Sequence, residues 1–229
     1  LGRYEEAIQC YDRALAINPN NTAVWNNKGA ILDDLGRHEE AIQCFDHVLA
    51  IDPNHTDAWF NKGTALSKLG RYEEAIQCYD RALAINPNHV NAWYNKGAAL
   101  ANLRRYKEAI KYFDHVLAID PNHVNAWLDK GLSLEILGRY EEAIQCYDRA
   151  LAINPNHVNA WLDKGVALAN LGRYEEAIQC YDRALAIDPN DADAWFNKGI
   201  TLRKLGRYEE AIQCYDRALA INPNNTAVW

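Results

Sequence analysis

Tryptophan recurs in this 229-residue chain at one fixed interval, and that interval constrains the fold more than any other feature. The seven tryptophans are 34 residues apart, at Trp25, Trp59, Trp93, Trp127, Trp161, Trp195 and Trp229. The seven prolines keep the same interval, from Pro19 to Pro223, and no linker interrupts the series. A fixed period of this length is typical of proteins built from small repeated units. The sequence therefore predicts stacked repeats rather than one or two globular domains.

Each repeat carries the pattern of two amphipathic helices joined by a turn. In the first complete copy, residues from Trp25 to Leu35 place their apolar side chains at helical spacing. Gly36 interrupts the pattern, and a second stretch of helical spacing runs from Ala41 to Leu49. Pro53 then ends it, because a residue before proline is pushed out of the helical region. Neither helix can bury its apolar stripe alone, so stacking of successive hairpins must bury both.

Residues at fixed places within the period resemble the tetratricopeptide repeat. In one copy they are Trp25, Gly29, Leu32, Ala41, Phe45, Val48 and Pro53. The resemblance covers the whole chain. It implies an all-α fold, a right-handed α-solenoid (superhelix) of stacked antiparallel helix hairpins.

The phase that is usual in this family divides the chain as a single array over residues 1–229. Six whole repeats are expected, at residues 22–55, 56–89, 90–123, 124–157, 158–191 and 192–225. Residues 1–21 would supply the second helix of an earlier hairpin, and residues 226–229 would begin another first helix. Residues 1–25 are identical to residues 205–229, which indicates duplication within a longer array or engineering from a few modules. The chain starts at Leu1 and has no methionine, so we interpret it as a fragment.

The first helices vary between copies, whereas the second helices are nearly constant. Residues 1–18 recur unchanged at 69–86, 137–154 and 205–222. The resemblance implies that partners bind along a concave groove lined by first helices. The variable positions there are our candidate partner-binding residues: Asn26, Phe60, Tyr94, Leu128, Leu162, Phe196, Thr64, Leu132, Asp34, Lys68, Asn102 and Lys204. Five of them form an apolar and aromatic row: Phe60, Tyr94, Leu128, Leu162 and Phe196. Such a row suits an extended peptide or an amphipathic helix. It could equally pack in part against neighbouring first helices, and the two interpretations are compatible.

We expect a protein-interaction scaffold whose partner is a protein or peptide. The alternative is a structural or self-assembling array that stacks head to tail, because neither end has the polar outer face of a capping repeat. An enzyme is not expected, since an active site is one asymmetric constellation and here every polar group recurs. The formal net charge of −7 gives no electrostatic attraction to a nucleic acid.

We expect no cofactor and no metal site. His55, His89, His123 and His157 recur once per repeat, too far apart to converge on an ion at about 2.0–2.3 Å, and we interpret them as solvated loop residues. No stretch approaches the roughly 20 apolar residues that span a bilayer, and no signal peptide is visible, so no membrane partner is expected. The six cysteines occupy equivalent helix positions that are too distant to bridge. Reduced thiols indicate a cytoplasmic location.

One lysine per repeat stands where the family usually has an apolar residue. These lysines are Lys28, Lys62, Lys96, Lys130, Lys164 and Lys198. We expect each aliphatic stem to lie along apolar surface. Each ammonium group would pair with an acid of a neighbouring helix, in the column that begins Asp12, Asp46 and Asp80. The tryptophans are predicted to belong to the core rather than to a platform for stacking bases.

Overall fold

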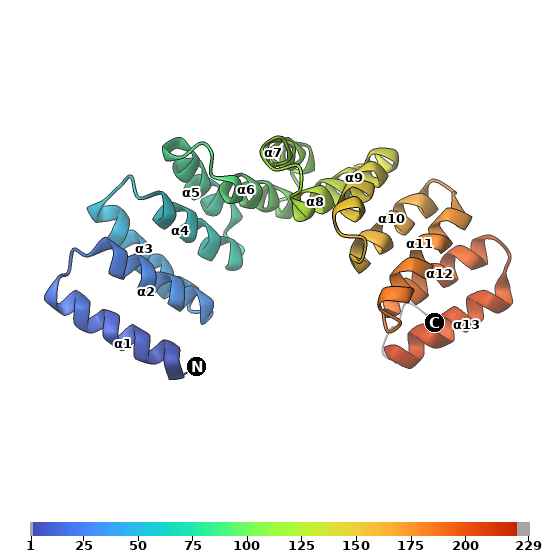
Figure 1. The fold of residues 1–229 in the computed structure, drawn as a ribbon, viewed down its shortest axis with the longest axis horizontal. Coiled ribbons are helices and arrows are strands. Elements are labelled where there is room, and N and C mark those ends of the chain that lie inside the picture. Colours follow the sequence, from blue (N-terminus) through green and yellow to red (C-terminus); the bar gives the residue numbers. More distant parts are fainter. Residues whose placement is uncertain (1, 224–229) are drawn as a thin grey trace. The chain divides into compact units, whose positions relative to one another are not determined.

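The computed structural model describes residues 2–223, and each element of secondary structure in that range is an α-helix (Figure 1). The helices are α1 (Gly2–Ile17), α2 (Thr22–Asp34), α3 (His38–Ile51), α4 (Thr56–Lys68), α5 (Tyr72–Ile85), α6 (Val90–Asn102), α7 (Tyr106–Ile119), α8 (Val124–Ile136), α9 (Tyr140–Ile153), α10 (Val158–Asn170), α11 (Tyr174–Ile187), α12 (Ala192–Lys204) and α13 (Tyr208–Ile221). The predicted all-α class is confirmed. Residues 226–229, expected to begin another helix, lie outside the described residues.

Each even-numbered helix forms a hairpin with the odd-numbered helix that follows it. We call them the first and second helix of a hairpin; α1 corresponds in sequence to a second helix. The chain divides into an N-terminal unit, residues 1–116, and a C-terminal unit, residues 117–229, which we describe separately. The expected single array of six whole repeats stays a prediction.

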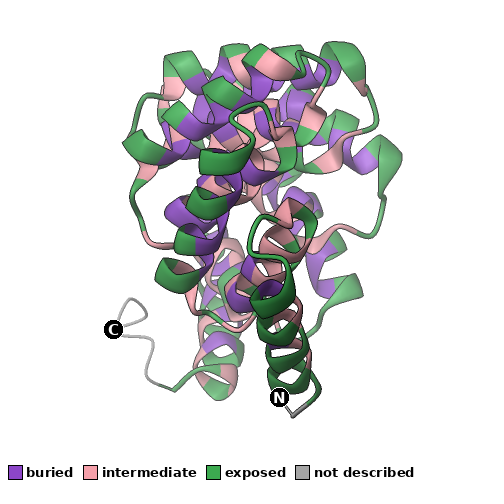
Figure 2. Cartoon of the chain, turned by 90° about the vertical axis from the view of Figure 1, so that its left-hand side faces the viewer, coloured by how far each residue is buried: buried purple, intermediate pink, exposed green. Residues whose placement is uncertain are grey.

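Packing follows the same succession in both units. In the N-terminal unit each helix from α2 to α5 packs against the next, and in the C-terminal unit the same holds from α8 to α12. Consecutive first helices also touch: α2 with α4, α4 with α6, α8 with α10, and α10 with α12. Figure 2 shows the result, with buried residues on the helix sides that face other helices and exposed residues outside. The solenoid-type stacking of hairpins that the sequence predicts is confirmed within each unit.

A large aromatic side chain of the second helix fills the centre of each hairpin. Five of these rings are at most 1% exposed: Phe45, Tyr79, Phe113, Tyr147 and Tyr181. A glycine of the first helix faces each ring. A Cβ atom added at Gly131 would lie 2.6 Å from Cε1 of Tyr147, too close for a real contact. The absence of a side chain therefore sets how closely the two helices approach.

The tryptophans lie beside this core and are partly buried. Trp59 packs against the buried clusters on one side and donates from its indole nitrogen to the carbonyl oxygen of Pro53, at 2.9 Å. The same bond recurs at Trp25, Trp93, Trp127, Trp161 and Trp195. The indoles therefore join the core, as predicted, and also tie each first helix to the loop before it.

The turn inside each hairpin needs a residue with positive φ. Gly70 has φ +76° there, and Arg104 takes the same place with φ +59°. An L-residue with a side chain is strained in this conformation, whereas glycine is not. The one arginine in a column of glycines is thus a local weak point of the N-terminal unit.

The histidines between hairpins cap the first helices, which corrects their interpretation as solvated loop residues. Nδ1 of His55 accepts a hydrogen bond of 3.2 Å from the backbone N–H of Ala58. His89, His123 and His157 do the same, and Asn21 and Asp191 use their side-chain oxygens. Each residue satisfies one free N–H group at a helix start, so the histidines are half-buried caps.

Candidate functional site

Lysine–aspartate pairs join five first helices to the second helix that precedes each of them. Nζ of Lys62 lies 2.5 Å from Oδ1 of Asp46 and 5.8 Å from the centre of the Trp59 ring. The same pair recurs as Lys28–Asp12, Lys96–Asp80, Lys164–Asp148 and Lys198–Asp182. The expected pairing is confirmed at these positions. Since each aspartate side chain is about half exposed, we assign these pairs a structural role worth about 1 kcal/mol or less.

The predicted apolar row is half-buried in the N-terminal unit. The ring centres of Phe60 and Tyr94 lie 6.1 and 6.0 Å from those of Tyr79 and Phe113. The row therefore packs on aromatic rings of the second helices. The ring centre of Phe60 also lies 4.6 Å from that of His89, the cap of the neighbouring first helix α6, as the alternative interpretation expected. Asn26, at the same position of α2, is also half-buried.

In the C-terminal unit, two leucines and one phenylalanine occupy the equivalent positions. Leu128 packs beside buried Leu151, and Leu162 beside buried Leu185. The ring of Phe196 lies 6.0 Å from that of Tyr215. All three are half-buried, so each keeps part of its surface accessible.

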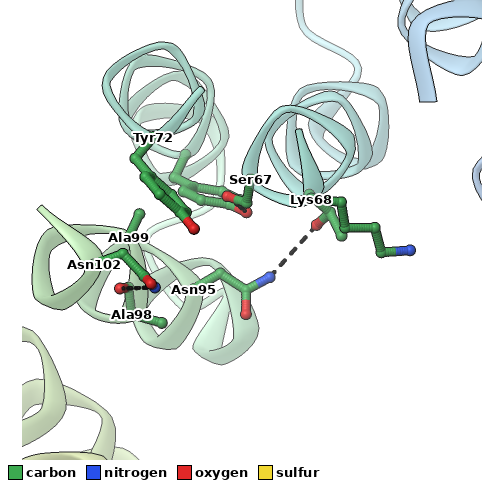
Figure 3. Close-up of a pocket in the computed structure, with 9 residues that line it drawn as sticks. Ser67, Lys68, Tyr72, Asn95, Ala98, Ala99 and Asn102 are labelled. Carbon is green, nitrogen blue, oxygen red and sulfur yellow. Dashed lines mark hydrogen bonds between the residues drawn. The ribbon is translucent and has the colours of Figure 1, made fainter. Parts of the chain in front are cut away.

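A cleft of about 260 Å³ opens between α4, α5 and α6 of the N-terminal unit (Figure 3). Its lining comes from these three helices: Thr64, Ser67, Lys68, Tyr72, Tyr79, Asn95, Ala98, Ala99 and Asn102. Thr64, Lys68 and Asn102 were predicted from the sequence to contact a partner. Phe60 and Tyr94 do not line this cleft, although they belong to the same first helices.

Hydrogen bonds hold the polar groups of the cleft in place. The hydroxyls of Ser67 and Tyr79 share a bond of 3.1 Å, and Nδ2 of Asn95 donates to Oγ1 of Thr64 at 3.4 Å. Nδ2 of Asn102 donates to a backbone carbonyl of its own helix at 2.9 Å. Burial raises the pKa of Tyr79, so its hydroxyl stays protonated at neutral pH. The cleft thus offers uncharged donors and acceptors on a partly apolar floor.

Charge appears only at the rim of the cleft. Nζ of Lys68 is 2.8 Å from Oδ2 of Asp33, and Nδ1 of His38 is 2.6 Å from the other oxygen of that carboxylate. Both carboxylate oxygens of Asp33 therefore have partners within the N-terminal unit. Its predicted neighbour Asp34 is exposed at the end of α2. Lys204, at the end of α12, places Nζ 5.5 Å from the centre of the Tyr174 ring.

In the C-terminal unit, carboxyl groups occupy the equivalent positions, 68 residues further on. Glu135 stands where Ser67 does, and Asp163 where Asn95 does. The Tyr147 hydroxyl donates to Oε2 of Glu135 at 3.0 Å. Burial raises the pKa of Glu135. Burial, and then the charge of Glu135, raise the pKa of Asp163 to about 7.

Apolar side chains flank these two acids. Leu132, a predicted site residue, is 47% exposed, and Ile136, one turn further along α8, is 51% exposed. The equivalent residues of the N-terminal unit are Thr64 and Lys68. The two units therefore present different chemistry at the same place in the hairpin.

The sequence reasoning missed the residues that carry much of this chemistry. Tyr79 and Tyr147 lie on the nearly constant second helices, where the sequence predicts no site residue. Ser67 and Glu135 belong to a variable column, immediately before the predicted column of Lys68. The variation within that column was the available signal.

The buried cysteines are poorly suited to thiol chemistry. Burial raises the pKa of Cys44, Cys78 and Cys180 to about 11, so these thiols remain protonated and poorly nucleophilic at neutral pH. No group of three or more histidine, cysteine and acidic side chains in that range could hold a metal ion. Likewise, none of the described helices has both the length and the apolar character to cross a membrane.

Sequence profiles of known families match almost the whole chain. Profiles described as tetratricopeptide repeat match residues 1–61, 56–89, 88–156, 128–192 and 162–226. The chain belongs to the tetratricopeptide repeat family. No curated protein sequence matches it.

Several solved structures of tetratricopeptide repeat type are similar to the chain in fold. The crystal structure of YrrB, titled a TPR protein with an unusual peptide-binding site, is 23% identical with a TM-score of 0.69, over 80% of this chain and 95% of that one. MamA from Desulfovibrio magneticus RS-1 is 23% identical with a TM-score of 0.71, over 75% and 97%. A tetratricopeptide repeat protein from Parabacteroides merdae ATCC 43184 is 20% identical with a TM-score of 0.73, over 99% and 90%. At this identity the likeness extends to the fold alone.

Proposed function

We propose that this chain is a protein-interaction scaffold that binds peptide segments on the faces of its first helices. The observation that carries the proposal is the cleft between α4, α5 and α6, where variable first-helix side chains surround a hydroxyl of a constant second helix. A fixed frame with exchangeable contact residues is what a recognition surface requires.

The chemistry of the cleft suits a peptide backbone. Asn95, Tyr79 and Ser67 can donate to carbonyl groups and accept from N–H groups, while Ala98 and Ala99 leave room for close approach. The half-buried rings of Phe60 and Tyr94 can supply apolar contact beside it. The fold also resembles that of YrrB, which is described as a TPR protein with an unusual peptide-binding site.

The test is a peptide selected from a displayed random library against the whole chain. Its affinity is then measured by fluorescence anisotropy. Asn102→Arg should weaken binding about tenfold or more, because a bulky side chain at an exposed position fills the cleft without disturbing the core. Gln77→Ala, on the outer face of α5, is the matched control and should leave affinity unchanged. Equal affinity of all three proteins for every selected peptide would overturn the proposal.

A further inference from the structure

The first helix α8 of the C-terminal unit exposes two apolar side chains, one on each side of Glu135 in the sequence. Leu132 and Ile136 are one turn apart and about half exposed. Glu135 lies between them in sequence, and its carboxylate accepts from the buried Tyr147 hydroxyl. Asp163 of α10 is a second half-buried acid. It stands at the position of Asn95, which lines one cleft together with Thr64, Ser67 and Lys68, the equivalents of Leu132, Glu135 and Ile136. We call this set the acidic-apolar face.

The two acids have no counter-charge of their own. Among residues 2–223, no lysine or arginine forms an ion pair with Glu135 or Asp163. The nearby charge that acts on Asp163 is that of Glu135, and both side chains are negative when ionised. Half-buried carboxyl groups of like charge are costly to ionise together. A cation placed between them would remove that cost.

Comparison between repeats shows that the equivalent positions of the N-terminal unit carry no such acids. In the N-terminal unit, Ser67 and Asn95 fill the equivalent positions and find hydrogen-bond partners within the chain. Two columns of acids elsewhere have printed partners of opposite charge: Asp46 and its equivalents pair with lysines, and Glu142 and its equivalents pair with arginines. The packing of the hairpin therefore does not require acids here.

We propose that the acidic-apolar face docks a peptide segment that presents a basic side chain, arginine or lysine, flanked by an apolar one. The cationic head would lie between Glu135 and Asp163, and the apolar neighbour would cover Leu132 and Ile136. This inference rests on the proposed function and names the partner chemistry of one unit. A metal ion is a poorer match, because no group of three candidate ligands exists among the described residues.

Arginine is the better of the two basic side chains for this geometry. Its planar guanidinium group can donate to two carboxylates at once, and its stem can lie along apolar surface. Two partly desolvated acids attract a cationic side chain more strongly than a neutral side chain of the same shape. The site should therefore select arginine over its uncharged analogue. The discrimination between arginine and its uncharged analogue citrulline is therefore the sharpest readout.

The experiment uses the full chain and two labelled peptides with blocked ends. The first peptide has one arginine flanked by leucines as its single charged residue, and the second has citrulline in place of that arginine. Anisotropy titrations should show binding of the arginine peptide that is about tenfold or more tighter than that of the citrulline peptide. Asp163→Asn and Glu135→Ser, which introduce the residues of the N-terminal unit, should remove that difference.

Two further variants separate this site from the general negative charge of the chain. Glu141→Gln removes one exposed acid of α9 and should leave the preference for arginine intact. Leu132→Thr, again the residue of the N-terminal unit, should weaken both peptides alike. Circular dichroism of each variant confirms that it is folded.

The outcomes distinguish failure of this site from failure of the proposed function. If Asp163→Asn and Glu141→Gln weaken arginine binding equally, or if the arginine peptide does not bind, the acidic-apolar face is not the docking site. When library-selected peptides still bind and respond to Asn102→Arg, the proposed function survives that failure. Loss of all peptide binding would remove both proposals.

Discussion

The Tyr147 hydroxyl donates to the carboxylate of Glu135 at 3.0 Å, whereas its equivalent Tyr79 meets the hydroxyl of Ser67 at 3.1 Å. The tyrosine is the same in both hairpins, and so is the buried position of its ring. The residue on the first helix decides whether the tyrosine hydroxyl bonds to a carboxylate or to a neutral hydroxyl. Surface chemistry can therefore change from hairpin to hairpin while the packing is kept.

Asp163→Asn should raise the free energy of unfolding at pH 8 and leave it nearly unchanged at pH 4. Burial and Glu135 raise the pKa of Asp163 to about 7 in the folded chain, against roughly 3.9 for an unfolded aspartate. Between these values the folded state holds a proton that the unfolded state has released, so stability falls as pH rises through that window. Asparagine avoids this loss. We expect a gain on the order of 1–3 kcal/mol at pH 8.

Urea denaturation at the two pH values measures this gain. Asp193→Asn, at an exposed position of α12, is the control and should have little effect at either pH. An equal effect of Asp163→Asn at pH 4 and pH 8 would show that Asp163 ionises normally in the folded chain.

Gly131→Ala should destabilise the C-terminal unit by about 1–3 kcal/mol. The added methyl group would stand 2.6 Å from the Tyr147 ring, which is fully buried and cannot move aside. Thermal denaturation measures the loss. The same substitution should cost less in a Tyr147→Leu background, where the ring edge is absent; an unchanged cost would mean that the ring does not limit the helix approach.

Arg104→Gly should stabilise the N-terminal unit by about 1 kcal/mol, because φ +59° is strained for arginine and not for glycine. Chemical denaturation gives the change. The reciprocal substitution Gly172→Ala, at φ +75°, should destabilise by a similar amount. If both variants have wild-type stability, backbone strain at this turn contributes nothing.

His157→Ala should cost about 1 kcal/mol, since it removes the acceptor for the backbone N–H of Ala160. His157→Asn should restore most of that loss, as Asn21 makes the equivalent bond in α2. The melting temperatures of the two variants test the cap. Equal melting temperatures for alanine and asparagine would show that the ring acts by packing alone.

The period and the helical spacing were enough to predict the fold class and the alternation of helices. Gly36 and Pro53 mark the turns, and the helices α2 and α3 end near them, because backbone conformation at glycine and before proline is decided locally. Thr64, Lys68 and Asn102 were correctly placed on variable first helices. That they share a cleft depends on how α4 and α6 pack, which no local pattern encodes.

The remaining site residues depend on tertiary packing. The sequence pattern places the ring of Tyr79 in the core. Only the close approach of α4 brings its hydroxyl to the cleft between α4, α5 and α6. Asp163 was passed over because its neighbour Glu135 is 28 residues away in sequence. The histidine caps were misjudged for a related reason: a side chain beside a loop can satisfy a helix N–H group as well as face solvent.

Hydrogen–deuterium exchange of the full chain, with and without a bound library-selected peptide, tests the central claim most directly. We predict that binding slows amide exchange in first helices, α4 and α6 above all. Exchange at the exposed residues of the second helix α5 should stay unchanged. Protection confined to second helices, or to the inter-hairpin loops, would contradict the assignment of the first-helix faces as the recognition surface.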